Sequence, residues 1–121
     1  MTVSGIDHVQ VAAPDGCEEQ ARAFYGELLG LEELPKPEAL AARGGCWFQA
    51  GAQELHIGVE EPFTPARKAH PSFVVSDLDD LAARLSEQGF AVRYDDLVPG
   101  TKRFETADPF GNRLEFRLAE D

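Results

Sequence analysis

Cysteine is scarce in this 121-residue chain, and long apolar runs are absent. The two cysteines, Cys17 and Cys46, stand far apart with no CxxC pair, so they predict no disulfide framework and suit a reducing cytosol. No stretch approaches the roughly 20 apolar residues of a membrane-spanning helix. The first residues lack the basic and apolar regions of a signal peptide. We therefore expect a cytoplasmic protein.

Basic residues are also few. The chain has 11 Lys and Arg against 22 Asp and Glu, which gives a net charge of −11. Such a surface repels phosphate backbones and anionic membranes, so we expect neither a nucleic-acid nor a membrane partner. The charge is explained by solubility or by attraction of a cationic ligand, and the sequence leaves both open.

The same order of elements occurs twice along the chain. Residues 6–11 alternate apolar and polar side chains as a strand does, and residues 18–29 carry apolar residues at helical spacing. Residues 70–75 again resemble a strand, and Asp77 is a typical N-cap for the helix that follows. His8 precedes Asp15 by the same interval at which His70 precedes Asp77. The chain is therefore predicted to contain an internal repeat.

Short extended stretches follow each predicted helix. They cover residues 32–34, 46–50 and 54–59 after the first helix, and 90–94, 103–107 and 113–118 after the second. The expected fold is α+β, with a first βαβββ module over residues 1–61, a linker over 62–69 and a second βαβββ module over 70–121. Neither module can bury its apolar faces alone, so we expect both to pack as one domain.

The last strands of the two modules can be aligned on their apolar residues. Residues 55–57 then match residues 114–116, with His56 at the position of Glu115 on the face away from the core. His8 and His70 match in the same way. These four positions include all three histidines of the chain.

Imidazole and carboxylate ligands together favour a divalent ion such as Zn²⁺, Ni²⁺, Fe²⁺, Mn²⁺ or Co²⁺. A single histidine is more often a residue satisfied by ordinary hydrogen bonds, but the coincidence of His8, His56, His70 and Glu115 favours a metal site. Glu54 lies on the same face as His56 and is an alternative to it as a ligand.

Several motifs in order along the chain resemble one known superfamily. They are Ile6-Asp7-His8-Val9, Ala23-Phe24-Tyr25, Leu29-Gly30-Leu31, Glu54-Leu55-His56-Ile57, the segment 70–78 and the segment 108–116. The chain resembles the vicinal oxygen chelate superfamily, which includes glyoxalase I, methylmalonyl-CoA epimerase, extradiol dioxygenases, fosfomycin-resistance thiol transferases and bleomycin-resistance proteins. The motifs span nearly the full length but do not distinguish between members.

The resemblance implies paired βαβββ modules that form a cupped mixed β-sheet with a metal ion in the cup. His8, His70 and Glu115 match the ligands found most widely in the superfamily. His56 falls on the strand that supplies a fourth ligand in the glyoxalase and epimerase branches, where Glu or Gln is usual. Family members of this length are often homodimers, so we expect a homodimer here.

The chemistry that the resemblance implies is capture of two neighbouring substrate oxygens by the metal, which acts as a Lewis acid. Glu115 or Glu54 would serve as general base. We expect a metal-dependent enzyme of lyase, isomerase, transferase or dioxygenase type, acting on a small oxygenated metabolite or an antibiotic. The alternative is a non-catalytic protein that sequesters a drug or metabolite, as the bleomycin-resistance branch does.

Candidate cavity or rim residues are Trp47, Phe48, Arg93, Arg103 and Phe110. For each of them, core packing or a solvated surface is the competing interpretation.

Overall fold

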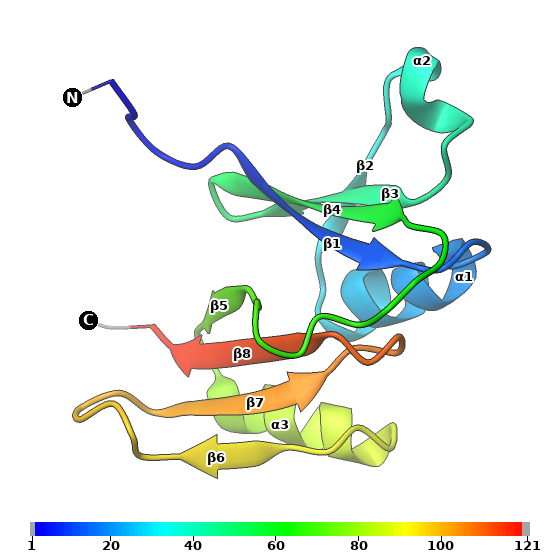
Figure 1. The fold of residues 1–121 in the computed structure, drawn as a ribbon. Coiled ribbons are helices and arrows are strands. Elements are labelled where there is room, and N and C mark those ends of the chain that lie inside the picture. Colours follow the sequence, from blue (N-terminus) through cyan, green and yellow to red (C-terminus); the bar gives the residue numbers. More distant parts are fainter. Residues whose placement is uncertain (1, 120–121) are drawn as a thin grey trace. The chain divides into compact units, whose positions relative to one another are not determined.

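The computed structural model describes residues 2–119, and the chain divides into two compact units between Thr64 and Pro65 (Figure 1). Each unit has a four-stranded mixed sheet with helical segments. This confirms the predicted fold class, α+β with two βαβββ modules. No helix within residues 2–119 combines the length and apolar content needed to cross a membrane.

The first unit carries its strands in the order β1-β4-β3-β2, with β1 parallel to β4 and the other pairs antiparallel. A helical segment connects β1 to the rest of the sheet, as a parallel pair of strands requires. The elements are β1 (His8–Ala13), α1 (Glu18–Ala21), the π-helix η1 (Arg22–Leu28), β2 (Glu32–Leu34), α2 (Glu38–Ala41), β3 (Cys46–Ala50) and β4 (Gln53–Val59).

The second unit repeats this topology. Its strand order is β5-β8-β7-β6, again with the first strand parallel to the last. The elements are β5 (Ser72–Val75), α3 (Leu78–Glu87), β6 (Arg93–Asp95), β7 (Arg103–Ala107) and β8 (Arg113–Leu118). Asp77 caps α3 as predicted, because its Oδ1 accepts a hydrogen bond of 3.1 Å from the Asp80 N–H.

The core of the first unit lies between its helical segment and one face of its sheet. Phe24 and Tyr25 of η1 are buried there, and the Tyr25 ring lies 6.0 Å from the ring of Phe48 on β3. Gly45 precedes β3 with φ +83°, and a Cβ at this position would lie 2.0 Å from the Ile57 carbonyl oxygen. Only glycine fits this close approach of the chain to β4.

The second unit has an equivalent core. Leu78, Leu81 and Leu85 form the buried stripe of α3, and the sheet contributes buried Phe104 and Phe116, whose ring centroids are 5.2 Å apart.

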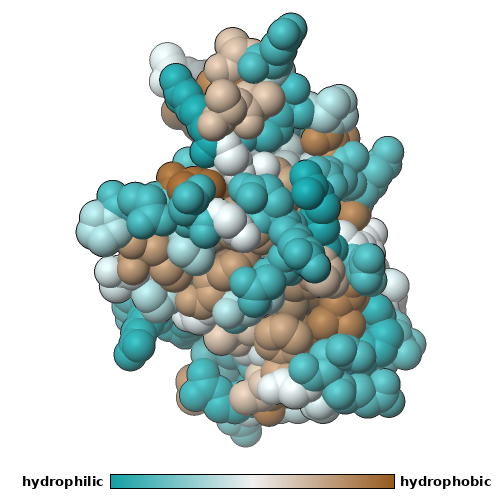
Figure 2. Space-filling model, turned by 90° about the vertical axis from the view of Figure 1, so that its right-hand side faces the viewer, coloured by the Kyte–Doolittle hydropathy of each residue, from teal (hydrophilic) through white to brown (hydrophobic). Residues whose placement is uncertain are grey.

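Hydrophilic residues, with apolar residues between them, cover much of the face shown in Figure 2. This distribution agrees with the high proportion of acidic residues.

Several element boundaries differ from the sequence prediction. The first strand begins at His8, and His70 precedes β5, which begins at Ser72. The strand predicted over 90–94 lies at Arg93–Asp95, and α2 was not predicted. The helix predicted over 18–29 becomes a π-helix from Arg22. The consecutive residues Phe24 and Tyr25 are both buried, and the wider π turn is compatible with directing both rings into the core.

The segment predicted as a linker is partly attached to the second unit. The Ala66 N–H donates to the Asn112 side-chain oxygen at 2.9 Å, and the Arg113 N–H donates to the Ala66 carbonyl at 2.8 Å. The boundary between the units accordingly falls before Pro65. That both modules act as one domain stays a prediction.

Candidate metal centre

The strand register makes His56 and Glu115 equivalent positions of the two units. Gln10 on β1 pairs with His56 on β4, and Ser72 on β5 pairs with Glu115 on β8. Gln10 follows His8 by the interval at which Ser72 follows His70. The alignment of residues 55–57 with 114–116 is thus confirmed by the hydrogen-bonded register.

The third strand of each unit adds one more equivalent position. Trp47 on β3 lies opposite His56, and Glu105 on β7 lies opposite Glu115. The same places on the two sheets therefore hold an aromatic group in the first unit and an acidic group in the second. The two sheets share a topology but differ in the chemistry of this face.

In the first unit the three rings form a stack. The His56 imidazole lies between the Trp47 indole, at 3.9 Å and 3° between planes, and the His8 imidazole, at 4.2 Å and 14°. His56 is only 5% exposed, although it points away from the core side of β4. Its Nε2 lies 2.9 Å from Glu54 Oε1, and His8 Nδ1 lies 2.9 Å from Asp7 Oδ2.

This stack affects how the two histidines can bind an ion. The lone pair of an imidazole nitrogen lies in the plane of its ring. Two nearly parallel rings stacked face to face, such as those of His8 and His56, do not direct their lone pairs at one point. The structure brings these two predicted ligands together, but one ring must turn before both bind the same ion. Glu54, the predicted alternative, is hydrogen-bonded to His56.

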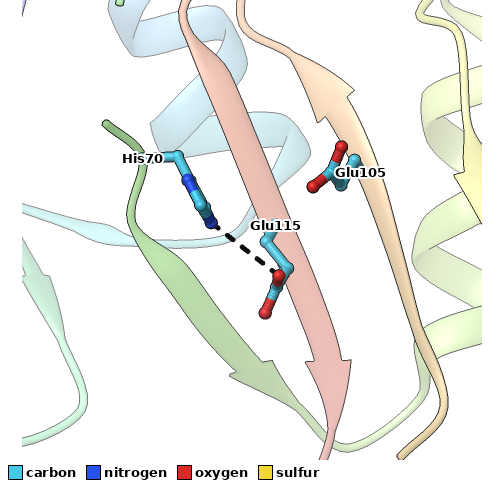
Figure 3. A group of neighbouring side chains, drawn as sticks. All are labelled: His70, Glu105 and Glu115. Carbon is cyan, nitrogen blue, oxygen red and sulfur yellow. Dashed lines mark ion pairs between the residues drawn. The ribbon is translucent and has the colours of Figure 1, made fainter. Parts of the chain in front are cut away.

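The second unit gathers an imidazole and two carboxylates. His70, Glu105 and Glu115 each place one potential ligand atom within 4.8 Å of the others, and His70 Nε2 lies 3.8 Å from Glu115 Oε1 (Figure 3). His70 Nδ1 lies 2.9 Å from the Lys68 carbonyl. A carbonyl only accepts, so Nδ1 carries a proton, and Nε2 is the ring nitrogen that faces the carboxylates. Metal-binding histidines commonly have such a partner on the second nitrogen.

Glu115 is held by donors on both oxygens. Ser72 Oγ donates to its Oε2 at 2.5 Å, and the Arg103 guanidinium donates to its Oε1. Arg103 Nε also donates to Asp95 Oδ1 at 2.9 Å. A hydrogen bond from the Leu97 N–H, together with Arg103, holds the pKa of Asp95 below its ordinary value. These contacts fix the Glu115 carboxylate in place before any ligand binds.

Glu105 has an arginine partner of its own. The Arg113 guanidinium donates twice to Glu105 Oε1, from Nε at 3.1 Å and from Nη2 at 2.5 Å. One imidazole with two carboxylates suits Fe²⁺, Mn²⁺ or Zn²⁺, so the donor set fits a divalent ion. A bound ion would share these carboxylates with their arginines.

The predicted ligands thus occur as two pairs, His8 with His56 and His70 with Glu115, each within one unit. The sequence did not single out Glu105, although the predicted strand 103–107 contains it, because only the pairing of β7 with β8 places it opposite Glu115. Among the rim candidates, Phe48 is fully buried in the core.

Two more rim candidates, Arg93 and Arg103, lie on the face that carries Glu105 and Glu115. Phe110 lies in the turn before β8 and is partly exposed.

Comparison with known proteins identifies relatives of the whole chain. Residues 5–116 match the model of the Glyoxalase/Bleomycin resistance protein/Dioxygenase superfamily. A glyoxalase family protein from Bacillus anthracis is 57% identical, with a TM-score of 0.94, over 99% of this chain and 98% of that one. No match to a curated protein was found.

More distant solved structures share the fold. Lactoylglutathione lyase from Agrobacterium tumefaciens is 22% identical with a TM-score of 0.75, over 98% of this chain and 96% of that one. TnmS3, an antibiotic binding protein from Streptomyces sp. CB03234, is 24% identical with a TM-score of 0.76, over 99% of each chain. At these identities the likeness concerns the fold alone.

Proposed function

The chain belongs to the Glyoxalase/Bleomycin resistance protein/Dioxygenase superfamily, and we propose that it is a divalent-metal-dependent enzyme acting on a small oxygenated metabolite or an antibiotic. The observation that carries this proposal is the arrangement of His70. Its Nδ1–H is held by the Lys68 carbonyl, and its Nε2 faces the carboxylate of Glu115. Metal-binding histidines have the same arrangement, with one ring nitrogen donating to an oxygen and the other directed at the ion.

In this proposal His70 and Glu115 are ligands from the second unit, with Glu105 within reach of the same ion. His8 and His56 of the first unit stay predicted ligands. Glu54 remains the alternative to His56, and the stacking of His56 against the His8 ring supports that alternative.

The bound metal would supply Lewis acidity to two neighbouring oxygens of the substrate. The contacts of the chain's own carboxylates then favour Glu54 over Glu115 as the general base. Both oxygens of Glu115 already accept hydrogen bonds, and the residue is 6% exposed. The side chain of Glu54 is 34% exposed, and its contact with His56 holds it in one orientation. A proton acceptor must be reachable by the substrate, which Glu54 satisfies better.

Metal analysis of the full chain, purified without an affinity tag, tests this function. We expect close to one divalent ion per chain in the wild type and in Lys68→Ala, which keeps the backbone carbonyl that holds His70. His70→Ala should lose the ion and remain folded by circular dichroism. Equal metal content in His70→Ala and Lys68→Ala would contradict the proposal.

The stack of Trp47, His56 and His8 favours a second candidate function, binding of a planar or cationic drug without chemistry. Aromatic rings attract cations and stack on flat ligands, and the acidic surface would draw in a cation. The antibiotic-binding TnmS3 shares the fold. Trp47 is the only tryptophan, so its fluorescence reports directly on this stack. Quenching by a cationic glycopeptide in metal-free protein would support this function, and an unchanged signal would count against it.

The cytoplasmic location and the homodimer predicted from the sequence also belong to this proposal. A sheet with open edge strands is prone to pair with another chain, which supports a dimer. Light scattering at micromolar concentration should give twice the chain mass of 13.2 kDa. A monomer at high micromolar concentration would contradict it.

A further inference from the structure

A short segment of the second unit, residues 68–72, contains one candidate ligand and contacts another. Within it, His70 Nδ1 lies 2.9 Å from the Lys68 carbonyl. The Pro71 carbonyl accepts a hydrogen bond of 3.1 Å from the Glu115 N–H. Ser72, the first residue of β5, then pairs with Glu115 in the parallel register of β5 and β8. The backbone of this segment therefore holds His70 close to Glu115.

Ser72 adds a side-chain contact to this backbone frame. Its Oγ lies 2.5 Å from Glu115 Oε2. A carboxylate only accepts, so the hydroxyl is the donor, and a short hydrogen bond from a hydroxyl to a carboxylate belongs to the stronger class. Glu115 is only 6% exposed. The contact therefore restrains a carboxylate that is almost completely shielded from water.

The two oxygens of Glu115 have different surroundings. Oε2 accepts from Ser72, whereas Oε1 accepts from Arg103 and lies 3.8 Å from His70 Nε2 (Figure 3). Each carboxylate oxygen has two lone pairs. Oε1 can therefore accept from Arg103 and still offer a lone pair to an ion beside His70.

We propose that Ser72 is a positioning residue of the metal centre, whose hydroxyl holds Oε2 of Glu115 so that the carboxylate binds the ion through Oε1. This inference rests on the proposed function and adds how a substrate reaches the ion. Carboxylates bind metal ions through one oxygen or through both. A carboxylate that uses one oxygen leaves a further position on the ion, which a substrate with two neighbouring oxygens needs.

The internal repeat supports this role. Gln10 occupies the position of Ser72 in the first unit, and it pairs with His56 in the position of Glu115. An imidazole binds a metal through one nitrogen and has no second oxygen to restrain. The hydroxyl thus occurs in the unit whose candidate ligand on the last strand is a carboxylate.

The variants Ser72→Thr and Ser72→Val test the hydroxyl. Both add a methyl group and have nearly the same shape, but only threonine keeps the hydroxyl. Ser72 is exposed at the start of β5, and β-branched residues suit strands. The Zn²⁺-loaded full chain is titrated by calorimetry with acetohydroxamate, which chelates through two neighbouring oxygens.

The hydroxyl should decide the affinity for acetohydroxamate. We expect Ser72→Thr to bind it within about threefold of the wild type and Ser72→Val to bind it at least about tenfold more weakly. The reason is that Oε2, once released, competes for the position that the second hydroxamate oxygen takes. Ser72→Ala removes the hydroxyl without adding any atom, and it decides the matter if Ser72→Val does not fold.

A second readout distinguishes positioning from a role in sheet stability. The visible absorption of Co²⁺, bound in place of Zn²⁺, depends on the number and arrangement of its ligands. Wild type and Ser72→Thr should give one spectrum, and Ser72→Val another. Ser76→Val changes an exposed serine just after β5 and should behave as the wild type in both measurements. Equal effects of Ser76→Val and Ser72→Val would overturn the role of Ser72.

The same measurements separate this inference from the function on which it rests. If the wild type does not bind Zn²⁺, or if the loaded wild type does not bind acetohydroxamate, the proposed function fails and the role of Ser72 fails with it. If the wild type binds both and Ser72→Val matches Ser72→Thr, the metal centre stands and the positioning role is wrong. Failure of folded Ser72→Val alone to load Zn²⁺ would support the role, because Glu115 would then need the hydroxyl to bind the ion at all.

Discussion

Trp47 and Phe48 are neighbours on β3 whose side chains lie on opposite faces of the sheet, and truncating each should have different consequences. Phe48 is 0% exposed and packs against Tyr25 in the core. Phe48→Ala removes a fully buried ring and should lower the free energy of unfolding by about 3–5 kcal/mol. Trp47 is partly exposed and stacks on His56. Trp47→Ala loses that contact and should cost about 1–2 kcal/mol.

Urea unfolding followed by circular dichroism measures both values without depending on the tryptophan. The total stability of a domain is about 5–15 kcal/mol, so Phe48→Ala leaves a small margin, and Phe48→Leu provides a milder variant if it does not fold. Trp47→Ala should change metal or ligand binding instead, because it uncovers one face of His56. Equal losses of stability in Trp47→Ala and Phe48→Ala would refute the assignment of the two faces.

Three further predictions concern the packing of the first unit. Burial raises the pKa of Cys17 and Cys46 to about 11. Both thiols should therefore react slowly with a disulfide reagent at pH 8 in the native protein and rapidly in urea. A rapid reaction in the native protein would contradict their burial. The Gly45 N–H lowers the pKa of Glu18, so this carboxylate stabilises the fold above its unfolded pKa of about 4.3 and loses that contribution as the pH falls through its lower folded value. Glu18→Gln should therefore flatten the fall in stability below about pH 4.3 in acid titrations. Gly45→Ala should cost more than about 1–3 kcal/mol in urea unfolding, because its Cβ meets a strand carbonyl, whereas Gly51→Ala, also at positive φ but with open space around it, should cost less.

The fold could be predicted because the alternating residues, the helical spacing and the capping residue indicate the same order of elements. The extended stretch predicted over 103–107 coincides with β7, and Asp77 marks the start of α3 by its capping chemistry. The exceptions have local causes. The π turn in η1 accompanies the burial of two consecutive aromatic residues, which a regular helical period does not indicate. The short α2 lies outside the repeat and has no buried residue that would produce an apolar pattern.

For the candidate site, the sequence predicted which positions of the two units are equivalent. It did not predict which side chains on neighbouring strands meet. The equivalence of His56 and Glu115 followed from apolar neighbours on the same strands, and the register confirms it. Contacts between strands were not visible in the sequence. Glu105 joins the metal cluster because β7 pairs with β8, and the Trp47 ring covers His56 because β3 pairs with β4. Phe48, named as a rim candidate beside Trp47, turned out to face the core, because the pleat separates neighbours.

The most direct test of the metal centre is calorimetric titration of metal-free protein with Zn²⁺, in the wild type and in single variants of the candidate ligands. His8→Ala and His70→Ala should each bind Zn²⁺ at least about tenfold more weakly, a loss of about 1.4 kcal/mol or more, with the fold retained. Comparing His56→Ala with Glu54→Ala identifies the fourth ligand, which is the one whose removal weakens binding. Wild-type affinity in both His8→Ala and His70→Ala would contradict the metal centre and leave drug binding as the better account.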